Sequence, residues 1–258
     1  MHGCAMRKDT PIGRSLRTYY APGRADALDG FHRRFLAAGD LGFDIGAHVG
    51  DRTASFRRIG ARAVAVEPQP ALARLLRRLF GRDDGVALAQ CLVGAHVGEA
   101  ELLLNSANPT VATASAAFVA AAAGAAGWQD QRWDGEAVAE MTTLDALVAR
   151  HGSPDFIKLD VEGYEAEALA GLSTPVRSLS FEFTTIQRDV AEDCVERAAA
   201  LGYGAFNACL GETLRFVHDA PLDADATRGW LRALPQAANS GDIYASTEPD
   251  RLLRRRQT

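Results

Sequence analysis

The stretch FDIGAHVGDRT, residues 43–53, places an acid and two glycines directly after a short apolar run. The run LGFDIG, residues 41–46, predicts a buried strand, and residues 50–59 predict the helix that follows it. We expect Gly46 to let the backbone turn sharply and Gly50 to let the helix lie close to a ligand. Because a helix N-terminus offers free N–H groups and a partial positive charge, this turn is a candidate ligand site.

Strand-like and helix-like segments alternate along the rest of the chain. Further strands are expected at residues 62–68, 86–93, 99–105, 154–160, 176–183 and 241–246. Helices are expected at 26–38, 70–80, 141–152, 163–172 and 189–201. Two alternating runs, 203–210 and 212–219, flank Gly211 and predict a hairpin. Since parallel strands need helical crossovers, the order predicts an α/β fold with a doubly wound, mostly parallel sheet and a C-terminal antiparallel hairpin.

The domain organisation expected from these patterns is simple. Residues 1–40 are expected to form an N-terminal lead-in, loose up to residue 25, and a helix. Residues 41–246 are expected to form one Rossmann-like domain with an alanine-rich insertion at 106–135, interpreted as a helix and an irregular, lid-like excursion. Residues 247–258 are expected to form a basic tail.

Composition excludes several classes of protein. Hydrophobic residues make up 47% of the 258 residues, which is enough for a packed core, and the net charge of −5 argues against a general nucleic-acid binder. The longest weakly apolar run, the alanine-rich residues 113–127, is too short and not apolar enough for a membrane span. No cysteine spacing predicts a CxxC metal or redox pair among Cys4, Cys91, Cys194 and Cys209. We therefore expect a reduced, cytoplasmic protein.

Two adenosine-bearing ligands compete for the turn after the first strand. Nicotinamide dinucleotides need the G-x-G-x-x-G pattern, whereas this chain has only Gly46 and Gly50, and Asp44 would repel a pyrophosphate. S-adenosylmethionine carries an ammonium group that Asp44 would attract, and Glu67 ends the second strand where an acid binds ribose hydroxyls. The alternatives are an NAD-dependent oxidoreductase, a non-catalytic Rossmann-like binding module, and a turn that only tightens the strand–helix joint.

A second informative stretch is PDFIKLDVEGYEAEALAGL, residues 154–172. Alternation places Lys158 inside the predicted strand, where an unpaired ammonium is costly. Our hypothesis is that Lys158 pairs with Asp44 or Glu182 from a neighbouring strand. Asp160 follows on the same face and ends the strand on the ligand side.

These motifs resemble the FkbM family of methyltransferases. The matching pieces are FDIGAHVG, VAVEPQP, TTLDAL, DFIKLDVEGYEAEALAGL and SFEF, which occur in the family's order between residues 41 and 183. The resemblance implies a seven-stranded class I methyltransferase fold, S-adenosyl-L-methionine as cofactor, and usually methylation of a hydroxyl on a sugar, glycan or secondary metabolite. His48 stands where the family often has asparagine.

The resemblance also carries over a set of site residues. The cofactor-binding set is Asp44, Ile45, Gly46, Ala47, His48, Gly50, Glu67, Pro68, Gln90, Cys91 and Asp160. Independently of the resemblance, the candidates for the catalytic base are Asp160, Glu162 and Glu182, together with His48 and His151. Asp160 ranks first because it ends its strand beside the cofactor turn. Its rival role is that of a ligand for a hard cation, although no metal follows from the spacing alone.

The sequence gives fewer indications of the acceptor pocket than of the cofactor site. Trp128 and Trp133 either line an acceptor pocket or pin the insertion. We expect a small-molecule or glycan substrate and neither nucleic acid nor a membrane span, and the oligomeric state is left open.

Overall fold

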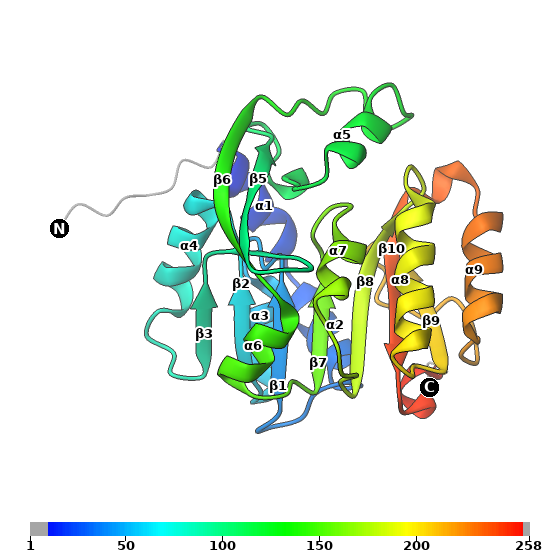
Figure 1. The fold of residues 1–258 in the computed structure, drawn as a ribbon. Helices are drawn as coiled ribbons and strands as arrows, with labels where there is room; N and C mark the ends of the chain where they lie inside the picture. Colours follow the sequence, from blue (N-terminus) through cyan, green and yellow to red (C-terminus); the bar gives the residue numbers. More distant parts are fainter. Residues whose placement is uncertain (1–9, 255–258) are drawn as a thin grey trace.

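A seven-stranded sheet runs through the centre of the protein, which a computed structural model describes for residues 10–254 (Figure 1). The strands follow the order β3 (Val86–Ala89), β2 (Arg62–Val66), β1 (Leu41–Ile45), β7 (Phe156–Leu159), β8 (Ser178–Thr184), β10 (Ser240–Ser246) and β9 (Ala205–Leu210). Within this sheet β10 runs antiparallel to both of its neighbours, and the other pairings are parallel. The predicted α/β fold with antiparallel C-terminal strands is confirmed.

Helices cover both faces of the sheet, as parallel strands require. One face packs against α6 (Leu144–His151), α7 (Glu165–Ala170), α8 (Arg188–Ala200) and α9 (Ala224–Ala233). The other face packs against α2 (Arg24–His32), α3 (Asp51–Ile59) and α4 (Pro70–Phe80). Within β7, Ile157 and Leu159 pack in the core on the α6–α9 face of the sheet, and Phe156 packs in the core on the α2–α3 face. The predicted alternation of this strand is therefore confirmed.

A second, smaller sheet lies over the carboxyl ends of β1, β2 and β7 (Figure 1). It has the order β4 (Leu92–Val93), β6 (Gly135–Thr142) and β5 (Gly98–Leu104). The turn η1 (Pro109–Val111) and the helix α5 (Ala116–Ala122) lie between β5 and β6. The single strand predicted at 86–93 is therefore wrong, because the chain leaves the main sheet after Ala89 and pairs again only with β6.

The N-terminal and C-terminal segments are more ordered than the sequence indicated. The expected loose lead-in contains α1 (Pro11–Tyr19), whose N-cap Thr10 accepts a hydrogen bond from the N–H of Gly13. At the other end, η3 (Pro249–Leu252) buries Leu252 completely, so this residue anchors the described part of the expected basic tail, most of which is exposed. Cys4 and residues 255–258 lie outside the described residues.

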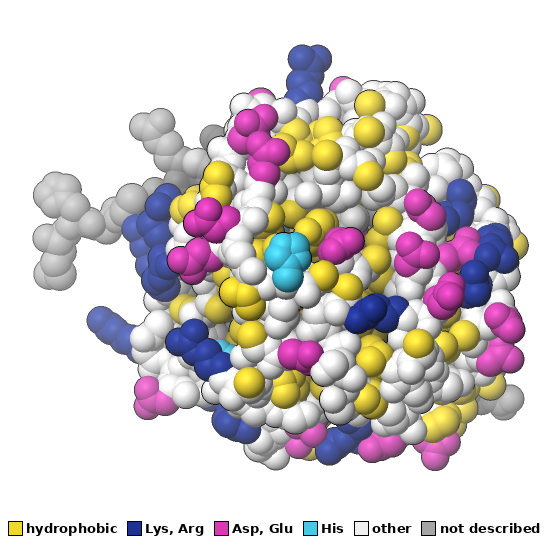
Figure 2. Space-filling model, in the orientation of Figure 1, with side chains coloured by type: hydrophobic (Ala, Val, Ile, Leu, Met, Phe, Trp, Pro, Cys, Tyr) yellow, Lys and Arg dark blue, Asp and Glu magenta, His cyan; other side chains and the backbone are white. Residues whose placement is uncertain are grey.

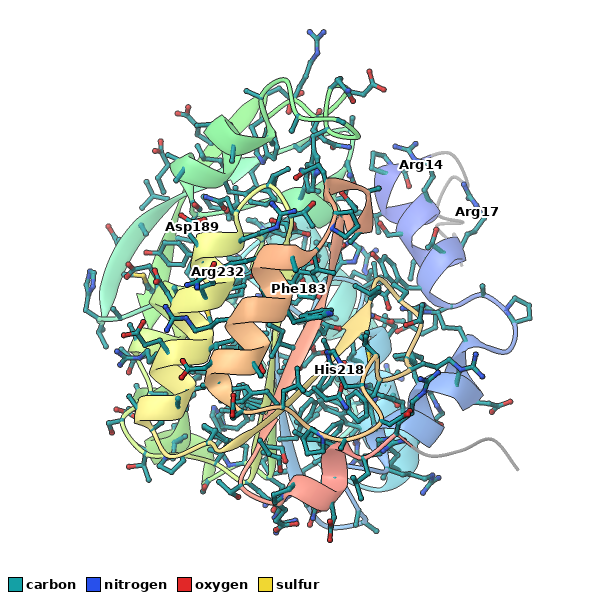
Figure 3. All side chains as sticks on the ribbon, turned by 90° about the vertical axis from the view of Figure 1, so that its right-hand side faces the viewer. Arg14, Arg17, Phe183, Asp189, His218 and Arg232 are labelled. Carbon is teal, nitrogen blue, oxygen red and sulfur yellow. The ribbon has the colours of Figure 1, made fainter. Side chains whose placement is uncertain are left out.

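The predicted hairpin at 203–219 is the clearest error. Residues 212–219 contain no strand, and β9 pairs instead with β10, which the chain reaches through α9. The side view shows α9 beside α8 over this end of the sheet (Figure 3). The aromatic ring of Trp230 on α9 contacts those of Phe183 and His218, and this packing fixes the crossover.

Within residues 10–254, no helix combines the length and the apolar character needed to cross a bilayer. On the face shown in Figure 2, acidic and basic side chains are interspersed.

Candidate active site

A cavity lies at the carboxyl ends of β1, β2 and β7, beneath the smaller sheet, and its empty space of about 780 Å³ includes open solvent at the mouth. Nine residues predicted from the sequence line it: Ile45, Gly46, Ala47, His48, Glu67, Pro68, Cys91, Asp160 and Glu162. Four others, Asp44, Gly50, Gln90 and Glu182, do not.

The turn after β1 depends on glycine at position 46. Gly46 has a φ of +82°, and a Cβ there would lie 1.8 Å from the carbonyl oxygen of Asp160. The N–H groups of Gly46 and Ala47 both donate to the carbonyl of Val66, each at 2.9 Å. The turn therefore ties the ends of β1, β2 and β7 together at the floor of the cavity.

Glu67 links the second strand to this turn. Its side chain is 3% exposed, and its two carboxylate oxygens accept hydrogen bonds from the N–H groups of His48 and Gln69, each at 2.9 Å. Burial raises the pKa of Glu67 to about 7, although both backbone bonds favour the ionised form. Because each carboxylate oxygen has two lone pairs, Glu67 can still accept hydrogen bonds from hydroxyl groups of a ligand.

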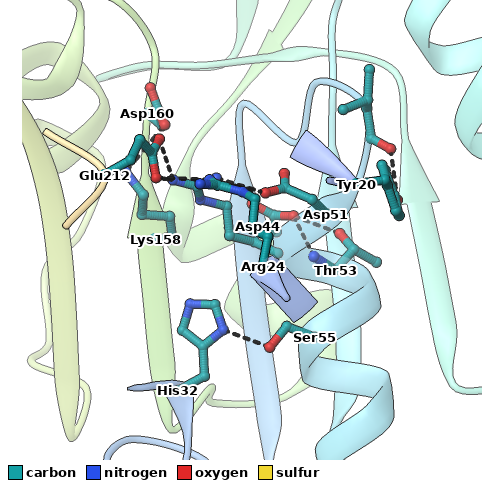
Figure 4. Close-up of polar contacts among 12 residues, drawn as sticks. Tyr20, Arg24, His32, Asp44, Asp51, Thr53, Ser55, Lys158, Asp160 and Glu212 are labelled. Carbon is teal, nitrogen blue, oxygen red and sulfur yellow. Dashed lines mark hydrogen bonds and ion pairs between the residues drawn. The ribbon is translucent and has the colours of Figure 1, made fainter. Parts of the chain in front are cut away.

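Asp44 lies elsewhere than the sequence indicated. Its Oδ2 accepts hydrogen bonds from the N–H of Thr53 at 2.9 Å and from the Thr53 hydroxyl at 2.5 Å (Figure 4). Burial raises its pKa to about 6 against these bonds. The Asp44 carboxylate thus fixes the first turn of α3 against β1, and its expected attraction for a ligand ammonium stays a prediction.

Gly50 and Gln90 also have structural surroundings outside the cavity. Gly50 has a φ of +80°, and a Cβ there would lie 2.5 Å from the Phe80 ring, so this glycine allows α4 to pack on the start of α3. Gln90 is exposed and accepts a hydrogen bond from Arg77. Of the pair predicted at the end of the third strand, Cys91 lines the cavity, and burial raises the pKa of its thiol to about 11.

Lys158 is paired, but not with the predicted partners. Its Nζ lies 2.7 Å from Asp242 Oδ1 and 3.2 Å from Asp160 Oδ2, and neither Asp44 nor Glu182 is a partner. The side chain is buried, which by itself would lower its pKa, and the carboxylates of Asp160 and Asp242 outweigh this effect and raise it. Lys158 is therefore a buried cation that orients the Asp160 carboxylate at the cavity.

The three predicted catalytic carboxylates do come together. One oxygen from each of Asp160, Glu162 and Glu182 lies within 4.8 Å of the others. Burial, followed by the charge of Asp160, raises the pKa of Glu162, and burial and the charge of Glu162 raise that of Glu182. Glu165 has a different part, because its carboxylate accepts the N–H groups of Val161 and Gly163 and holds the intervening turn.

The two tryptophans of the insertion pack on each side of one phenylalanine. The ring centroids of Trp128 and Trp133 lie 5.2 and 6.1 Å from that of Phe118, which is fully buried. Trp133 also donates its indole N–H to the carbonyl of Val111. Neither tryptophan lines the cavity, so of the two alternatives the structure supports the one in which they pin the insertion.

The comparison with protein families decides between the remaining functions. The family model described as "Methyltransferase FkbM domain" matches residues 44–202, which is more than half of the chain. The chain belongs to the FkbM methyltransferase family. It is therefore an S-adenosylmethionine-dependent methyltransferase, and the NAD-dependent oxidoreductase and the non-catalytic module are set aside.

Solved structures of other methyltransferases resemble this FkbM methyltransferase only remotely. An O-methyltransferase from Bacillus cereus in complex with SAH has 12% identity and a TM-score of 0.45, with 95% of this chain and 94% of that chain covered. A TehB-like SAM-dependent methyltransferase from Corynebacterium glutamicum has 11% identity and a TM-score of 0.45, with 92% and 96% covered. These likenesses carry no argument about the site. Among curated proteins, no sequence matches the chain.

The cavity of this FkbM methyltransferase also has walls that the sequence did not predict. Arg52 lies between Asp51 and Glu212, at 2.8 and 2.9 Å, and these three residues line the cavity beside Tyr19. Figure 4 shows Asp51 and Glu212 gathered around Arg24. Other lining residues are Gln69, Leu92, Val93, Leu102, Thr110, Ala112, Thr113, Ala114, Val161 and Tyr164. No sequence signal joined these distant segments.

Proposed function

We propose that this FkbM methyltransferase transfers the methyl group of S-adenosylmethionine to a hydroxyl oxygen of a sugar, glycan or secondary metabolite. The observation that supports the proposal most is the position of Asp160. Its carboxylate lines the cavity, is 30% exposed, and is held by the buried ammonium of Lys158. A carboxylate held in this way can accept the proton of a hydroxyl nucleophile.

The cofactor is proposed to lie along the turn after β1. Glu67 would accept hydrogen bonds from the ribose hydroxyls, because it lines the cavity and retains lone pairs. Cys91 and Pro68 would lie beside the adenine, and the backbone of residues 46–48 beside the methionine part. This placement brings the methyl group toward Asp160.

In the proposed reaction the protein forms no covalent bond to the cofactor or the acceptor. The acceptor oxygen forms a bond to the methyl carbon while the carbon–sulfur bond breaks, which yields a methyl ether and S-adenosylhomocysteine. The hydroxyl proton passes to the carboxylate of Asp160. Orientation supplies about 7–11 kcal/mol of the barrier at most, and a positioned base contributes about 10²–10⁴-fold in rate.

A product analysis tests this proposal. The enzyme is incubated with S-adenosylmethionine labelled in the methyl group and with pools of sugars, glycans and small metabolites. Label released as methanol by mild alkali identifies a methyl ester, and mass spectrometry and NMR of the alkali-stable product distinguish a methyl ether from a methylated amine. Label in esters or amines alone would contradict O-methylation of a hydroxyl.

The Asp160→Asn variant tests the assigned base. We expect turnover to fall about 100-fold or more while the affinity for S-adenosylhomocysteine stays within about threefold. Glu167→Gln is the matched control, because Glu167 is an exposed acid on α7 outside the cavity lining. An Asp160→Asn enzyme as active as this control would remove Asp160 from catalysis.

A further inference from the structure

Three carboxylates meet at the carboxyl ends of two adjacent strands without enough positive charge to balance them. Asp160 and Glu162 follow β7, and Glu182 lies in β8, which pairs with β7. One oxygen of each lies within 4.8 Å of the others. The nearest ammonium, that of Lys158, is already shared between Asp160 and Asp242. When all three carboxyls are ionised, the group therefore carries more negative charge than Lys158 balances.

One of these side chains is buried, and another has a buried oxygen without a partner. Glu162 is 7% exposed, and only burial and neighbouring charges, not a hydrogen bond, act on its carboxylate among residues 10–254. The Oε2 atom of Glu182 is buried and likewise has no hydrogen-bond partner in that part of the chain. A buried carboxylate without a partner is costly, so a ligand that supplies positive charge would remove the cost.

A neutral side chain shows the same lack of a partner next to this group. Gln187 is 8% exposed, and its Oε1 has no hydrogen-bond partner among the described residues. It lines a small cavity together with Glu182 and Gly163, the residue after Glu162. The unpartnered oxygen of Gln187 belongs to a neutral side chain, so it is evidence independent of the acidic residues. It is also a further oxygen atom of the kind that Mg²⁺ and Ca²⁺ prefer, in a cavity shared with Glu182.

We propose that Asp160, Glu162 and Glu182 form a binding site for one divalent, oxygen-preferring cation such as Mg²⁺, Mn²⁺ or Ca²⁺. Oxygen ligands surround Ca²⁺ at about 2.3–2.6 Å and Mg²⁺ at about 2.0–2.1 Å. Two ligands on opposite sides of Ca²⁺ are thus about 4.6–5.2 Å apart, and adjacent ligands lie closer. The limit of 4.8 Å between the three carboxylates lies within this Ca²⁺ span, whereas Mg²⁺, with opposite ligands about 4.0–4.2 Å apart, requires the side chains to move closer.

The position of the site suggests a role for the ion in binding the acceptor, and this role rests on the proposed function. Asp160 and Glu162 line the main cavity, so an ion that they hold has open positions toward an acceptor. A hydroxyl oxygen bound there is oriented toward the cofactor, and the charge of the ion lowers the pKa of the hydroxyl. Asp160 would then bind the ion through one carboxylate oxygen and still accept the hydroxyl proton, as proposed above.

Manganese titration of the full chain tests the site without cofactor or acceptor. Chelator-treated protein is titrated with MnCl₂, and free Mn²⁺ is measured by electron paramagnetic resonance. We expect one saturable site per chain, with competition by Mg²⁺ and at least tenfold weaker binding in Glu162→Gln and Glu182→Gln. Glu167→Gln, which removes the same charge from an exposed position on α7, should bind as the wild type does.

Two results would overturn the proposal. One is the absence of a saturable site in the wild-type chain, and the other is equal affinity in the wild type, Glu162→Gln and Glu182→Gln. Circular dichroism checks that each variant folds, and thermal unfolding of the wild type gives a second measurement, because Mg²⁺ should raise its midpoint. Since no methyl transfer is measured, failure of the proposed reaction would leave these results unchanged.

Discussion

Lys158 and Asp242 form a buried ion pair that reaches across the strand lying between theirs. Their charged atoms are 2.7 Å apart, although β7 and β10 are separated by β8 in the sheet. Ser180 of β8 lies opposite Lys158, and its small side chain leaves room for the lysine to pass. The pair therefore connects the parallel half of the sheet to the antiparallel end directly beside the cavity.

Lys158→Met should destabilise the fold. The substitution leaves Asp242 and Asp160 without their shared cation, and loss of one partner of a buried pair costs about 3–5 kcal/mol. The measurement is the free energy of unfolding in urea. The double variant Lys158→Met, Asp242→Leu should recover part of the loss, and an unchanged unfolding midpoint in the single variant would contradict the role of the pair.

Gly46→Ala should damage the cofactor site more than its backbone strain alone explains. The new methyl group would lie 1.8 Å from the carbonyl oxygen of Asp160, so the turn and the end of β7 must separate. Gly39→Ala is the matched control, because Gly39 also has a positive φ, +90°, but has nothing within 4 Å of its Cβ position. We expect the control to lose about 1–2 kcal/mol of stability and to bind S-adenosylhomocysteine normally.

Calorimetry distinguishes the two substitutions. Gly46→Ala should bind S-adenosylhomocysteine at least tenfold more weakly than Gly39→Ala does. Equal affinities in the two variants would show that the close approach of the turn to β7 does not shape the cofactor site.

Local patterns predicted the central part of the fold well. The apolar runs that became β1, β2, β7 and β8 have short crossovers between them, and burial on both faces of a parallel sheet leaves a near-continuous apolar signature. The helix at 70–80 has the same bounds in the structure. The smaller sheet was missed because β4 has only two residues and because most of β6, residues 136–140, was assigned to no element.

The site was predictable where one segment supplies it and unpredictable where distant segments meet. Residues 45–48 and Glu67 follow strand ends, so topology places them at the cavity. The direction of the Asp44 side chain depends on which face of β1 meets α3, which no local pattern gives. Glu212 was assigned to a strand, whereas its ion pairs with Arg24 and Arg52 hold its segment beside the cavity.

His48 should make the stability depend on pH. Burial lowers the pKa of His48 to about 4, whereas an unfolded histidine has a pKa near 6.5. Between these values the unfolded chain binds a proton that the folded chain does not, so the free energy of unfolding decreases as the pH falls from 6.5 toward 4. His48→Asn should remove this contribution, and asparagine tolerates the φ of +49° at this position.

The expected difference is measurable by urea unfolding at two pH values. Between pH 7.5 and 5, His48→Asn should lose roughly 1–2 kcal/mol less stability than the wild type. His32, whose pKa is lowered to about 3 chiefly by burial, contributes equally to both proteins and cancels. Parallel pH profiles for the two proteins would show that His48 titrates normally.

Substitutions of Asp44 and Glu67 should have different effects, the first on stability and the second on cofactor affinity. Asp44→Ala leaves the buried N–H and hydroxyl of Thr53 without their acceptor and should cost about 1–3 kcal/mol of stability. Since Asp44 is outside the cavity lining, the affinity of the folded variant for S-adenosylhomocysteine should change little. Glu67→Gln should weaken that affinity about tenfold or more. A stable Asp44→Ala protein that fails to bind would instead place Asp44 in contact with the cofactor.

A crystal structure of the chain with S-adenosylhomocysteine would test the cofactor site most directly. The nucleoside should lie in the cavity between residues 46–48 and Glu67, with a ribose hydroxyl within hydrogen-bonding distance of the Glu67 carboxylate. A cavity filled by side chains, with the compound bound elsewhere or absent from well-ordered crystals, would contradict this placement.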